Sequence, residues 1–312
     1  MVAHTPSGTA LSHLPAGTPL ERAMCWVNGL PTSPDAPALQ VSDRGFTLAD
    51  GCFETMRAYR GVIFHLGAHL ERLAATADRL RIALPPHLEQ SVSAATRALR
   101  AARADASVRL TISRGIGAGV AVPPGAVPTT VLLIGRLPVF PSTLVTAGLT
   151  VRIASGRRNE HATTAGLKTL SYTDTVLGLI EARDAGAEDA LFLDTAGHLC
   201  EGTSSNLFVV ANGVVHTPPR SCGILPGVTR AAVLGLLEAS GTPVDEAPVP
   251  PEALDTADEV FLTSSLREIA PVTRVGERPV GSGRPGPLTH RLQAAYRMMV
   301  ASAVADETGG AA

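Results

Sequence analysis

The sequence predicts a mixed α/β protein, of the α+β or α/β class, that is built from two domains. Short β-type runs alternate with amphipathic helical segments along the 312 residues, and a segment that contains two prolines divides the chain near its middle. A chain of this length can bury the cores of one or two domains. We expect a disordered leader over residues 1–20, a small N-terminal α/β domain over 21–136, an interdomain loop over 137–147 and a large C-terminal domain over 148–312.

The predicted N-terminal domain combines several strands with two helices. CWVNGL is typical of a strand that ends in a turn at Asn28-Gly29, and a loop then leads to a strand over 52–59. VIFHL predicts another strand after a glycine turn. Apolar residues at helical spacing predict a helix over 67–82 and a second helix over about 89–103. SVRLTISRG and TTVLLIG are β-type runs, and the Gly- and Pro-rich stretch IGAGVAVPPGAVP separates them.

The predicted C-terminal domain begins with the strand GLTVRIAS and the helix SYTDTVLGLIEARDAG, which ends on a glycine. ALFLDTAGHLCEGTSSNLFVVANGVVHTPP predicts a β meander with turns at Ala196-Gly197 and Asn212-Gly213. GVTRAAVLGLLEAS predicts a helix that follows a Pro-Gly loop. DEVFLTSSLREIAPV predicts a strand that leads into a serine-rich turn.

The composition indicates a soluble protein of the cytoplasm. Hydrophobic residues make up 45% of the chain and charged residues 17%, and the formal net charge of -2 provides no basic field for nucleic acid. No window approaches 18 uninterrupted apolar residues and the N-terminus lacks the pattern of a secretory signal, so we expect no membrane partner. The four cysteines are widely separated and form no CxxC pair, which disfavours a zinc site or a disulfide scaffold.

Lys168 is the only lysine of the chain, because every other residue among its 26 lysines and arginines is an arginine. Arginine serves surface charge and anion binding as well as lysine does, but it cannot lose a proton and attack a carbonyl as a neutral amine. A surface lysine is the ordinary alternative. The small and apolar neighbours in AGLKTLSY favour a desolvated amine that forms an imine with a carbonyl compound.

Two further stretches suit a polar ligand. In CEGTSSNLFVV, Glu201 follows a β run and precedes a turn rich in hydroxyl groups; its carboxylate could hold a cationic ring nitrogen, and a solvated hairpin is the alternative. In GILPGVTRAAVLGLL, Val228 and Thr229 begin a helix whose free amides and dipole suit an anion such as phosphate. The alternative there is a plain capped helix.

Together these stretches resemble the class IV, or fold type IV, pyridoxal-phosphate aminotransferases, a family that includes branched-chain aminotransferases, D-amino-acid aminotransferases and aminodeoxychorismate lyases. The resemblance extends from about Trp26 to Tyr296 and rests on SDRGFTLADGCFETMRAY, AHLERL, LKTLSY, EGTSSN, LPGVTR and ADEVFLTSSLREIAPV, in that order. It implies the fold of that family, in which two α/β domains hold pyridoxal 5′-phosphate between them.

The resemblance also implies roles for individual residues. Lys168 matches the catalytic lysine that forms a Schiff base with the cofactor, and Glu201 matches the carboxylate that keeps the pyridine nitrogen protonated. Arg72 matches the arginine on the cofactor phosphate, and Tyr172 matches a partner of the ring's phenolic oxygen. The remaining cofactor-binding residues are Ser204, Ser205, Asn206, Val228, Thr229 and Ser265. Because guanidinium cannot form the imine, this chemistry accounts for the single lysine.

The resemblance implies transamination between an amino acid, of the branched-chain or D type, and a 2-oxo acid. The substrate site would consist of Phe53, Thr55, Arg109, Ser265 and Leu266. Arg109 matches an arginine that branched-chain enzymes use for the side-chain carboxylate of glutamate, whereas Gly119 stands where D-specific enzymes and lyases carry an arginine. Thr55 matches a threonine of the lyases, so 4-amino-4-deoxychorismate lyase, which releases pyruvate and 4-aminobenzoate, is the alternative activity.

The resemblance finally implies a homodimer in which a loop of the partner completes each active site. IGAGVAVPPGAVP fits this role, because its glycines and prolines suit an irregular loop better than a packed element. A binding protein without cofactor is the alternative outside the enzymes. Such a protein would keep the fold and lose Lys168 or Glu201, and both residues are present.

Overall fold

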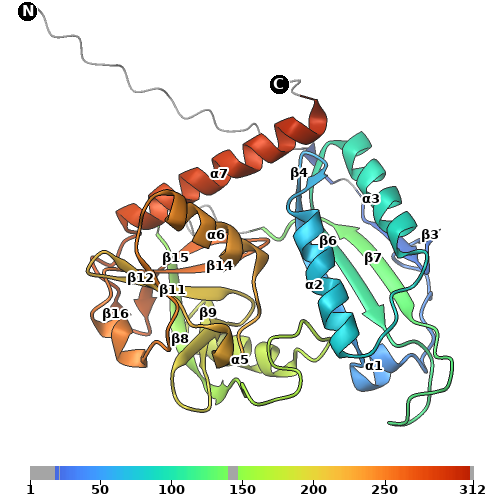
Figure 1. Cartoon of the computed structure of the whole chain (residues 1–312), viewed down its shortest axis with the longest axis horizontal. Coiled ribbons are helices and arrows are strands. Elements are labelled where there is room, and N and C mark those ends of the chain that lie inside the picture. Colours follow the sequence, from blue (N-terminus) through green and yellow to red (C-terminus); the bar gives the residue numbers. More distant parts are fainter. Residues whose placement is uncertain (1–17, 21, 140–146, 310–312) are drawn as a thin grey trace, which may run out of the picture.

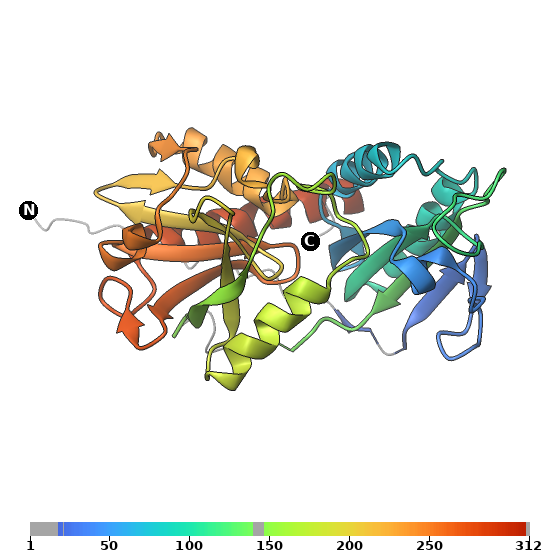
Figure 2. The same ribbon diagram turned by 90° about the horizontal axis from the view of Figure 1, so that it is seen from below.

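The computed structural model describes residues 18–20, 22–139 and 147–309, and its strands form two separate sheets. Figures 1 and 2 show the two sheets as two lobes that lie side by side. The first lobe contains the first sheet with helices α1 to α3, and the second lobe contains the second sheet with helices α5 to α7. Helices and strands alternate in both, so the predicted mixed α/β class is confirmed.

The first sheet has seven strands in the order β3-β2-β7-β6-β4-β5, with β1 paired to β6. They are β1 (Thr18–Pro19), β2 (Met24–Val27), β3 (Leu30–Thr32), β4 (Gly51–Tyr59), β5 (Val62–Ile63), β6 (Ala104–Ser113) and β7 (Thr129–Gly135). Helices α2 (Leu66–Arg79) and α3 (Leu88–Ala102) pack on this sheet because each gathers its apolar residues on one face. The shared core includes Leu73, Ala77, Ala95, Leu99, Val108 and Ile112.

The second sheet closes on itself. Its strand order is β10-β9-β8-β15-β14-β11-β12-β13, and β10 also pairs with β11, so the strands from β10 to β11 form a ring. The strands are β8 (Leu149–Arg157), β9 (Asp189–Leu193), β10 (Leu199–Gly202), β11 (Asn206–Ala211), β12 (Val214–His216), β13 (Val244–Asp245), β14 (Glu259–Ser264), β15 (Glu268–Val275) and β16 (Arg278–Pro279). Glu201 lies opposite Asn206 in the closing pair, which fixes the short turn between them.

Side chains along β11 point alternately to the two faces of the sheet, so one set fills the core inside the ring of strands and the other set packs against the helices outside it. Leu207 and Val209 point into the core that the ring strands share, whereas Phe208 points to the opposite face. There it packs with α6 (Val228–Ala239) and α7 (Pro287–Thr308). Helix α5 (Thr173–Asp184) contacts β8 and β9.

The two lobes also share a core. Phe64, which follows β5, packs its ring against Tyr296 of α7 with the centroids 5.5 Å apart. Tyr59 and Val62 belong to the same cluster as Phe208 and the buried face of α7. Figure 1 shows α7 running from the second sheet toward α3. This contact holds the lobes in a fixed relation and so defines the space between them.

The structure departs from the expected elements at several places. Helix α1 (Arg44–Leu48) lies within the expected loop, and Asp43 caps it by accepting a hydrogen bond from the backbone N–H of Gly45 at 2.7 Å. The strand expected over VIFHL ends at Ile63, because α2 already begins at Leu66. Strand β15 and helix α7 were not predicted. The α7 sequence spreads its apolar residues around the helix, which weakens its periodic signal.

The predicted leader over residues 1–20 is too long at its C-terminal end. Thr18–Pro19 pair with β6, and Leu20 is buried in the core of the first lobe, while residues 1–17 lie outside the described residues. Residues 140–146 of the expected interdomain loop also lie outside them, and the domain boundaries stay a prediction. None of the helices in the described part of the chain combines the length and apolarity that a membrane-spanning segment requires.

Candidate active site

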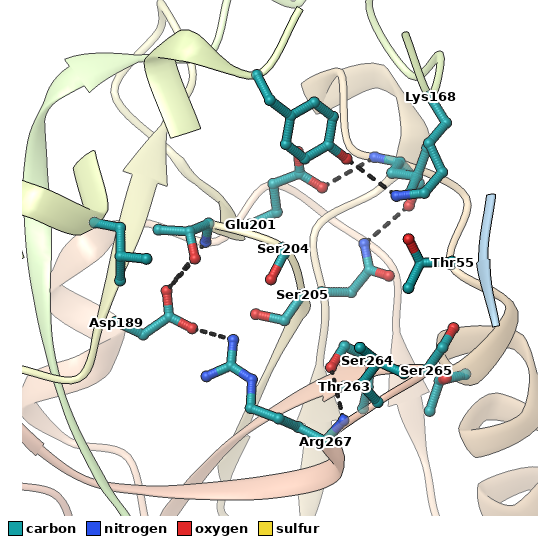
Figure 3. A pocket seen from close by; sticks show the side chains of 18 of the residues that line it. Thr55, Lys168, Asp189, Glu201, Ser204, Ser205, Thr263, Ser264, Ser265 and Arg267 are labelled. Atoms are coloured by element: carbon teal, nitrogen blue, oxygen red, sulfur yellow. Dashed lines mark hydrogen bonds and ion pairs between the residues drawn. The ribbon is translucent and has the colours of Figure 1, made fainter. Parts of the chain in front are cut away.

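A cavity of about 770 Å³ lies between the two lobes (Figure 3). Its walls come from β4, β6 and α2 of the first lobe and from β10, α6 and the β14–β15 turn of the second. Every predicted site residue lines it: Phe53, Thr55, Arg72, Arg109, Lys168, Tyr172, Glu201, Ser204, Ser205, Asn206, Val228, Thr229, Ser265 and Leu266. The fold therefore brings residues from both halves of the chain to one place.

Lys168 is held by backbone pairing with the first lobe. The N–H of Phe53 donates to the carbonyl of Lys168 at 3.0 Å, and the N–H of Leu170 donates to the carbonyl of Gly51 at 3.0 Å. The side chain is buried, with 9% of its surface exposed, and Nζ donates to the hydroxyl of Tyr172 at 3.0 Å. Nζ also lies 4.5 Å from the centre of the Phe53 ring. The amine thus points into the cavity between two aromatic side chains.

Glu201 lies on another wall of the cavity, at the pair that closes the ring of strands. Its Oε2 accepts a hydrogen bond from the N–H of Leu225 at 3.0 Å, and its Oε1 lies 3.4 Å from Nε of Arg158. Burial raises the pKa of Glu201, and the Arg158 guanidinium, the Leu225 amide and the charge of Lys168 act against this rise. The carboxylate is therefore a group whose ionisation depends on neighbouring positive charge.

Arg72 of α2 is oriented by a buried carboxylate. Its Nε and Nη2 donate to the two oxygens of Glu54 at 2.8 and 2.7 Å, and its Nη1 donates to the carbonyl of Pro226 at 2.9 Å. Glu54 is fully buried and also contacts His69 at 2.7 Å. Burial by itself raises the pKa of Glu54, but the hydrogen bonds and charges of Arg72 and His69 bring it below its usual value. This pairing fixes the guanidinium next to the start of α6.

The start of α6 offers free amides. Gly227 is the N-cap, and no side chain caps the helix, so the N–H groups of Val228 and Thr229 have no helical partner. Asn206 donates from Nδ2 to the carbonyl of Leu225 at 2.9 Å and thereby holds the loop that enters the helix. A Cβ at Gly227 would lie 1.9 Å from Oδ1 of Asn206, so this close approach requires glycine.

The turn between β14 and β15 forms a further wall. Arg57 donates from Nη1 to the carbonyl of Leu266 at 2.8 Å, so β4 of the first lobe holds this turn of the second. Figure 3 shows Ser264 and Ser265 on the turn, below the serines of the β10–β11 turn. Ser205 Oγ and Thr263 Oγ1 are buried and have no hydrogen-bond partner among the described residues. Such orphaned hydroxyls are available to a ligand.

The remaining wall combines an apolar ring with a cation. Arg109 on β6 lies opposite Thr55 on β4, and its guanidinium carbon lies 3.7 Å from the centre of the Phe53 ring. Arg109 forms no salt bridge with any residue that the structure describes within 22–139 or 147–309. Phe53 separates this cation from Lys168.

Four charged residues that orient this site were not predicted from the sequence: Glu54, Arg158, Asp189 and Arg267. Glu54 lies in FETMR and Arg267 in SLRE, which are parts of motifs that the analysis used for their neighbours. Their role depends on partners far along the chain, such as Asp189 for Arg267. A charged residue within a motif of otherwise apolar or small residues is the signal that could have found them.

Comparison with known proteins identifies the family. The model of the class IV aminotransferases matches residues 51–275. A putative branched-chain-amino-acid aminotransferase of Methanocaldococcus jannaschii is 34% identical over 274 residues, which cover 87% of this chain and 94% of the relative. A D-alanine aminotransferase of Bacillus licheniformis is 32% identical over 278 residues, covering 86% and 94%.

Solved structures agree with this result. The branched-chain amino acid aminotransferase of Escherichia coli superimposes with a TM-score of 0.83 at 29% identity, over 88% of this chain and 93% of the other. The 4-amino-4-deoxychorismate lyase of Pseudomonas aeruginosa superimposes with a TM-score of 0.78 at 34% identity, over 88% and 98%. The chain belongs to the class IV aminotransferases, with the fold type IV architecture. It is a transaminase whose cofactor is pyridoxal 5′-phosphate.

The residues of the cavity fit this cofactor. A phosphate group requires positive charge and hydrogen-bond donors, and Arg72 with the uncapped start of α6 supplies both at one end of the cavity. The orphaned hydroxyls of Ser205 and Thr263 offer further contacts to a ligand. The buried amine of Lys168 and the carboxylate of Glu201 both line the same cavity.

Proposed function

We propose that the enzyme moves the amino group of a branched-chain amino acid to a 2-oxo acid that carries a second carboxylate, such as 2-oxoglutarate. Arg109 is the observation that carries this proposal. Its guanidinium lies against Phe53 in the cavity wall and forms no salt bridge with a described residue. A wall that is apolar on Phe53 and cationic on Arg109 suits an apolar side chain in one half-reaction and a carboxylate in the other.

In this proposal Lys168 is the residue to which the cofactor is linked. Arg72 and the amides of Val228 and Thr229 hold its phosphate, and Glu201 faces its pyridine nitrogen. The Arg158 guanidinium, 3.4 Å from Oε1, favours the charged carboxylate and so opposes the burial that raises the pKa of Glu201. Pyridoxal 5′-phosphate, when bound, withdraws electrons from the α-carbon of the substrate. The protein therefore contributes binding, orientation and charge.

Lys168 would also move the proton. Once substrate is bound, its free amine can take a proton at Nζ from the substrate α-carbon and deliver it again on the cofactor side. Tyr172 accepts a hydrogen bond from Nζ at 3.0 Å and so keeps the amine directed into the cavity. The low exposure of the lysine, 9%, excludes most water from this transfer.

The substrate would bind between the β14–β15 turn and the first lobe. The proposal places the backbone N–H groups of Ser265 and Leu266 at the carboxylate next to the α-carbon, with Ser265 also within reach of the cofactor phosphate. Phe53 and Thr55 would contact the substrate side chain from β4. Arg57 supports this arrangement, because it donates to the carbonyl of Leu266 and so fixes the turn at the wall of the cavity.

We further propose a cytoplasmic homodimer, in which the segment over 115–127 reaches the active site of the partner. This segment does not line the cavity of its own chain. Arg44, with 3% of its surface exposed, donates to the carbonyls of Gly119, Val120 and Ala121 at 2.7 to 3.2 Å. These bonds hold the segment away from its own site, and Val120 stays 84% exposed. A second copy is the occupant that would cover it.

A panel of amino donors tests the substrate class. Purified enzyme loaded with pyridoxal 5′-phosphate is mixed with L- or D-leucine, L- or D-alanine, or aminodeoxychorismate, and the cofactor spectrum and products are followed. Reaction with L-leucine and regeneration by 2-oxoglutarate supports the proposal. Reaction with D-alanine alone would instead match the Bacillus licheniformis relative. Release of pyruvate and 4-aminobenzoate would establish the lyase, which Thr55 and the Pseudomonas aeruginosa structure favour as the second candidate.

A further inference from the structure

Asp189, the first residue of β9, is a fully buried carboxylate outside the set of residues placed so far at cofactor or substrate. Its Oδ1 accepts hydrogen bonds from the hydroxyl of Thr203 at 2.6 Å and from the N–H of Ala190 at 2.9 Å. Its Oδ2 pairs with the guanidinium of Arg267. A buried carboxylate keeps its charge only with such compensation, so these contacts are coupled to one another.

The carboxylate joins two turns that both line the cavity. Thr203 lies in the turn between β10 and β11, two residues after Glu201, and Arg267 lies in the turn between β14 and β15. The two turns start from neighbouring strands, because Asn206 of β11 pairs with Thr263 of β14. Figure 3 shows the Arg267 side chain reaching back from its turn to Asp189.

The β14–β15 turn is also fixed from the first lobe. The Tyr59 hydroxyl donates to Oε1 of Glu268 at 2.8 Å, and Nη1 of Arg57 lies 3.1 Å from the same oxygen. Glu268 has a φ of +59°, in the left-handed region that side chains other than glycine rarely adopt. A turn with this backbone persists where its surroundings hold it, and here it is held from both lobes.

We propose that Asp189 and Arg267 are positioning residues that keep the Ser264–Leu266 turn aimed at the substrate carboxylate. This inference rests on the proposed function, which places that carboxylate at the turn. Donors bind an anion tightly when they are aimed in advance, and a loosened turn must be ordered at each binding event. The cofactor is held mainly by Arg72, α6 and Lys168, so the clamp between Asp189 and Arg267 should affect the binding of the substrate carboxylate more than the affinity for the cofactor.

Direct binding of the substrate by Arg267 would have the opposite effect on the affinity for a carboxylate. If Arg267 bound the substrate carboxylate itself, Asp189 would compete with the substrate for the guanidinium. Asp189→Asn would then free the cation and tighten the binding of a carboxylate. If Asp189 and Arg267 instead hold the turn together, Asp189→Asn removes the charge that holds Arg267, and the binding of a substrate carboxylate weakens.

The experiment uses the enzyme loaded with pyridoxal 5′-phosphate and the variants Asp189→Asn and Arg267→Lys. Glu259→Gln is the matched control, because Glu259 is another buried carboxylate that accepts several hydrogen bonds. It lies at the end of β14 that is away from the turn, and its donors are Leu288 and Thr289 at the start of α7. Amide hydrogen exchange over 264–267 reports the turn. The dissociation constant of 4-methylpentanoate, which is leucine without its amino group, is measured from the cofactor absorbance. The KM and kcat for leucine and the affinity for the cofactor complete the set.

We expect Asp189→Asn to speed amide hydrogen exchange over 264–267 and to weaken the binding of 4-methylpentanoate about tenfold. It should also raise the KM for leucine more than it lowers kcat. Arg267→Lys, which keeps a charge for Asp189, should recover part of this loss, and cofactor affinity should fall much less than the affinity for 4-methylpentanoate. Unchanged exchange, or tighter binding of 4-methylpentanoate, would overturn the clamp.

If the unaltered enzyme neither binds 4-methylpentanoate nor reacts with leucine, the proposed substrate class is wrong. The exchange data still decide the clamp in that case. Faster exchange over 264–267 in Asp189→Asn than in Glu259→Gln supports it, and equal exchange in both variants overturns it. If Asp189→Asn does not fold, Arg267→Lys takes its place in the same comparison, with slower exchange than in an Arg267→Met variant as the supporting result.

Discussion

The two sides of the cavity differ in how their charges are balanced. On the side assigned to the cofactor, Arg72 has Glu54 and Glu201 has Arg158, and each partner belongs to the same chain. On the side assigned to the substrate, Arg267 pairs with Asp189 and Arg57 with Glu268, but Arg109 lies on Phe53 without a salt bridge to a described residue. The first side has each of these charges paired, which suits a ligand that is always the same. The second side keeps a charge free for a ligand that changes between the two half-reactions.

Replacement of Lys168 on the cofactor side should have the largest effect on activity. Lys168→Arg keeps the positive charge but removes the amine that links the cofactor and moves the proton, so turnover should fall by several orders of magnitude with every substrate. Borohydride reduction of the unaltered enzyme, followed by peptide mapping, should place a pyridoxyl label on the peptide that contains position 168. A reduced enzyme without any label would refute this assignment.

Glu201→Gln tests the other end of the cofactor side. The amide keeps the size and the hydrogen bond with Leu225, but it carries no charge to stabilise a protonated pyridine nitrogen. We expect the rate of each half-reaction to fall about 10- to 1000-fold, with the cofactor still linked. Glu181→Gln, an exposed carboxylate on α5 that accepts bonds from Ser155, is the control. Equal half-reaction rates in the two variants would show that Glu201 is structural.

The sequence predicted residues that line both sides of the cavity, but not the charged residues that orient them. Lys168, Glu201, Arg72 and the start of α6 lie in short motifs whose residue types follow from imine, carboxylate and phosphate chemistry. Their common cavity confirms that the fold brings them together. The residues that orient them were missed because pairs such as Arg267 and Asp189 form only after β9 and the β14–β15 turn meet.

The limits of the fold prediction have similar causes. Helices α2 and α3 were predicted because each concentrates its apolar residues on one face. Helix α7 was missed, since it packs between both lobes and distributes buried residues over more of its surface. The closure of the second sheet also depends on pairs between strands that are far apart in the sequence, β8 with β15 and β11 with β14, and no local pattern indicates them.

Arg109→Leu removes, on the substrate side of the cavity, the charge that forms no salt bridge with a described residue. A charge-assisted hydrogen bond contributes about 1.5–3 kcal/mol, so KM for 2-oxoglutarate should rise about 10- to 100-fold. KM for leucine and the affinity for the cofactor should change little, because neither depends on a second carboxylate. The two KM values are measured separately in the two half-reactions. An equal rise for both substrates would mean that Arg109 supports Phe53 and does not select the substrate.

Gly119→Arg has the smallest expected effect and tests whether the segment over 115–127 belongs to the substrate side of a partner. A Cβ at Gly119 meets no atom within 4 Å, so the side chain can be accommodated, although the φ of +65° costs a residue other than glycine about 1 kcal/mol. Gly119→Ala carries the same backbone strain without the charge and is the matched control. In a dimer, the new guanidinium should raise the relative use of substrates with an extra carboxylate about two- to tenfold, with unchanged cofactor affinity. Sedimentation of the active enzyme as a monomer, or the same substrate profile in both variants, would show that this segment does not reach a partner's site.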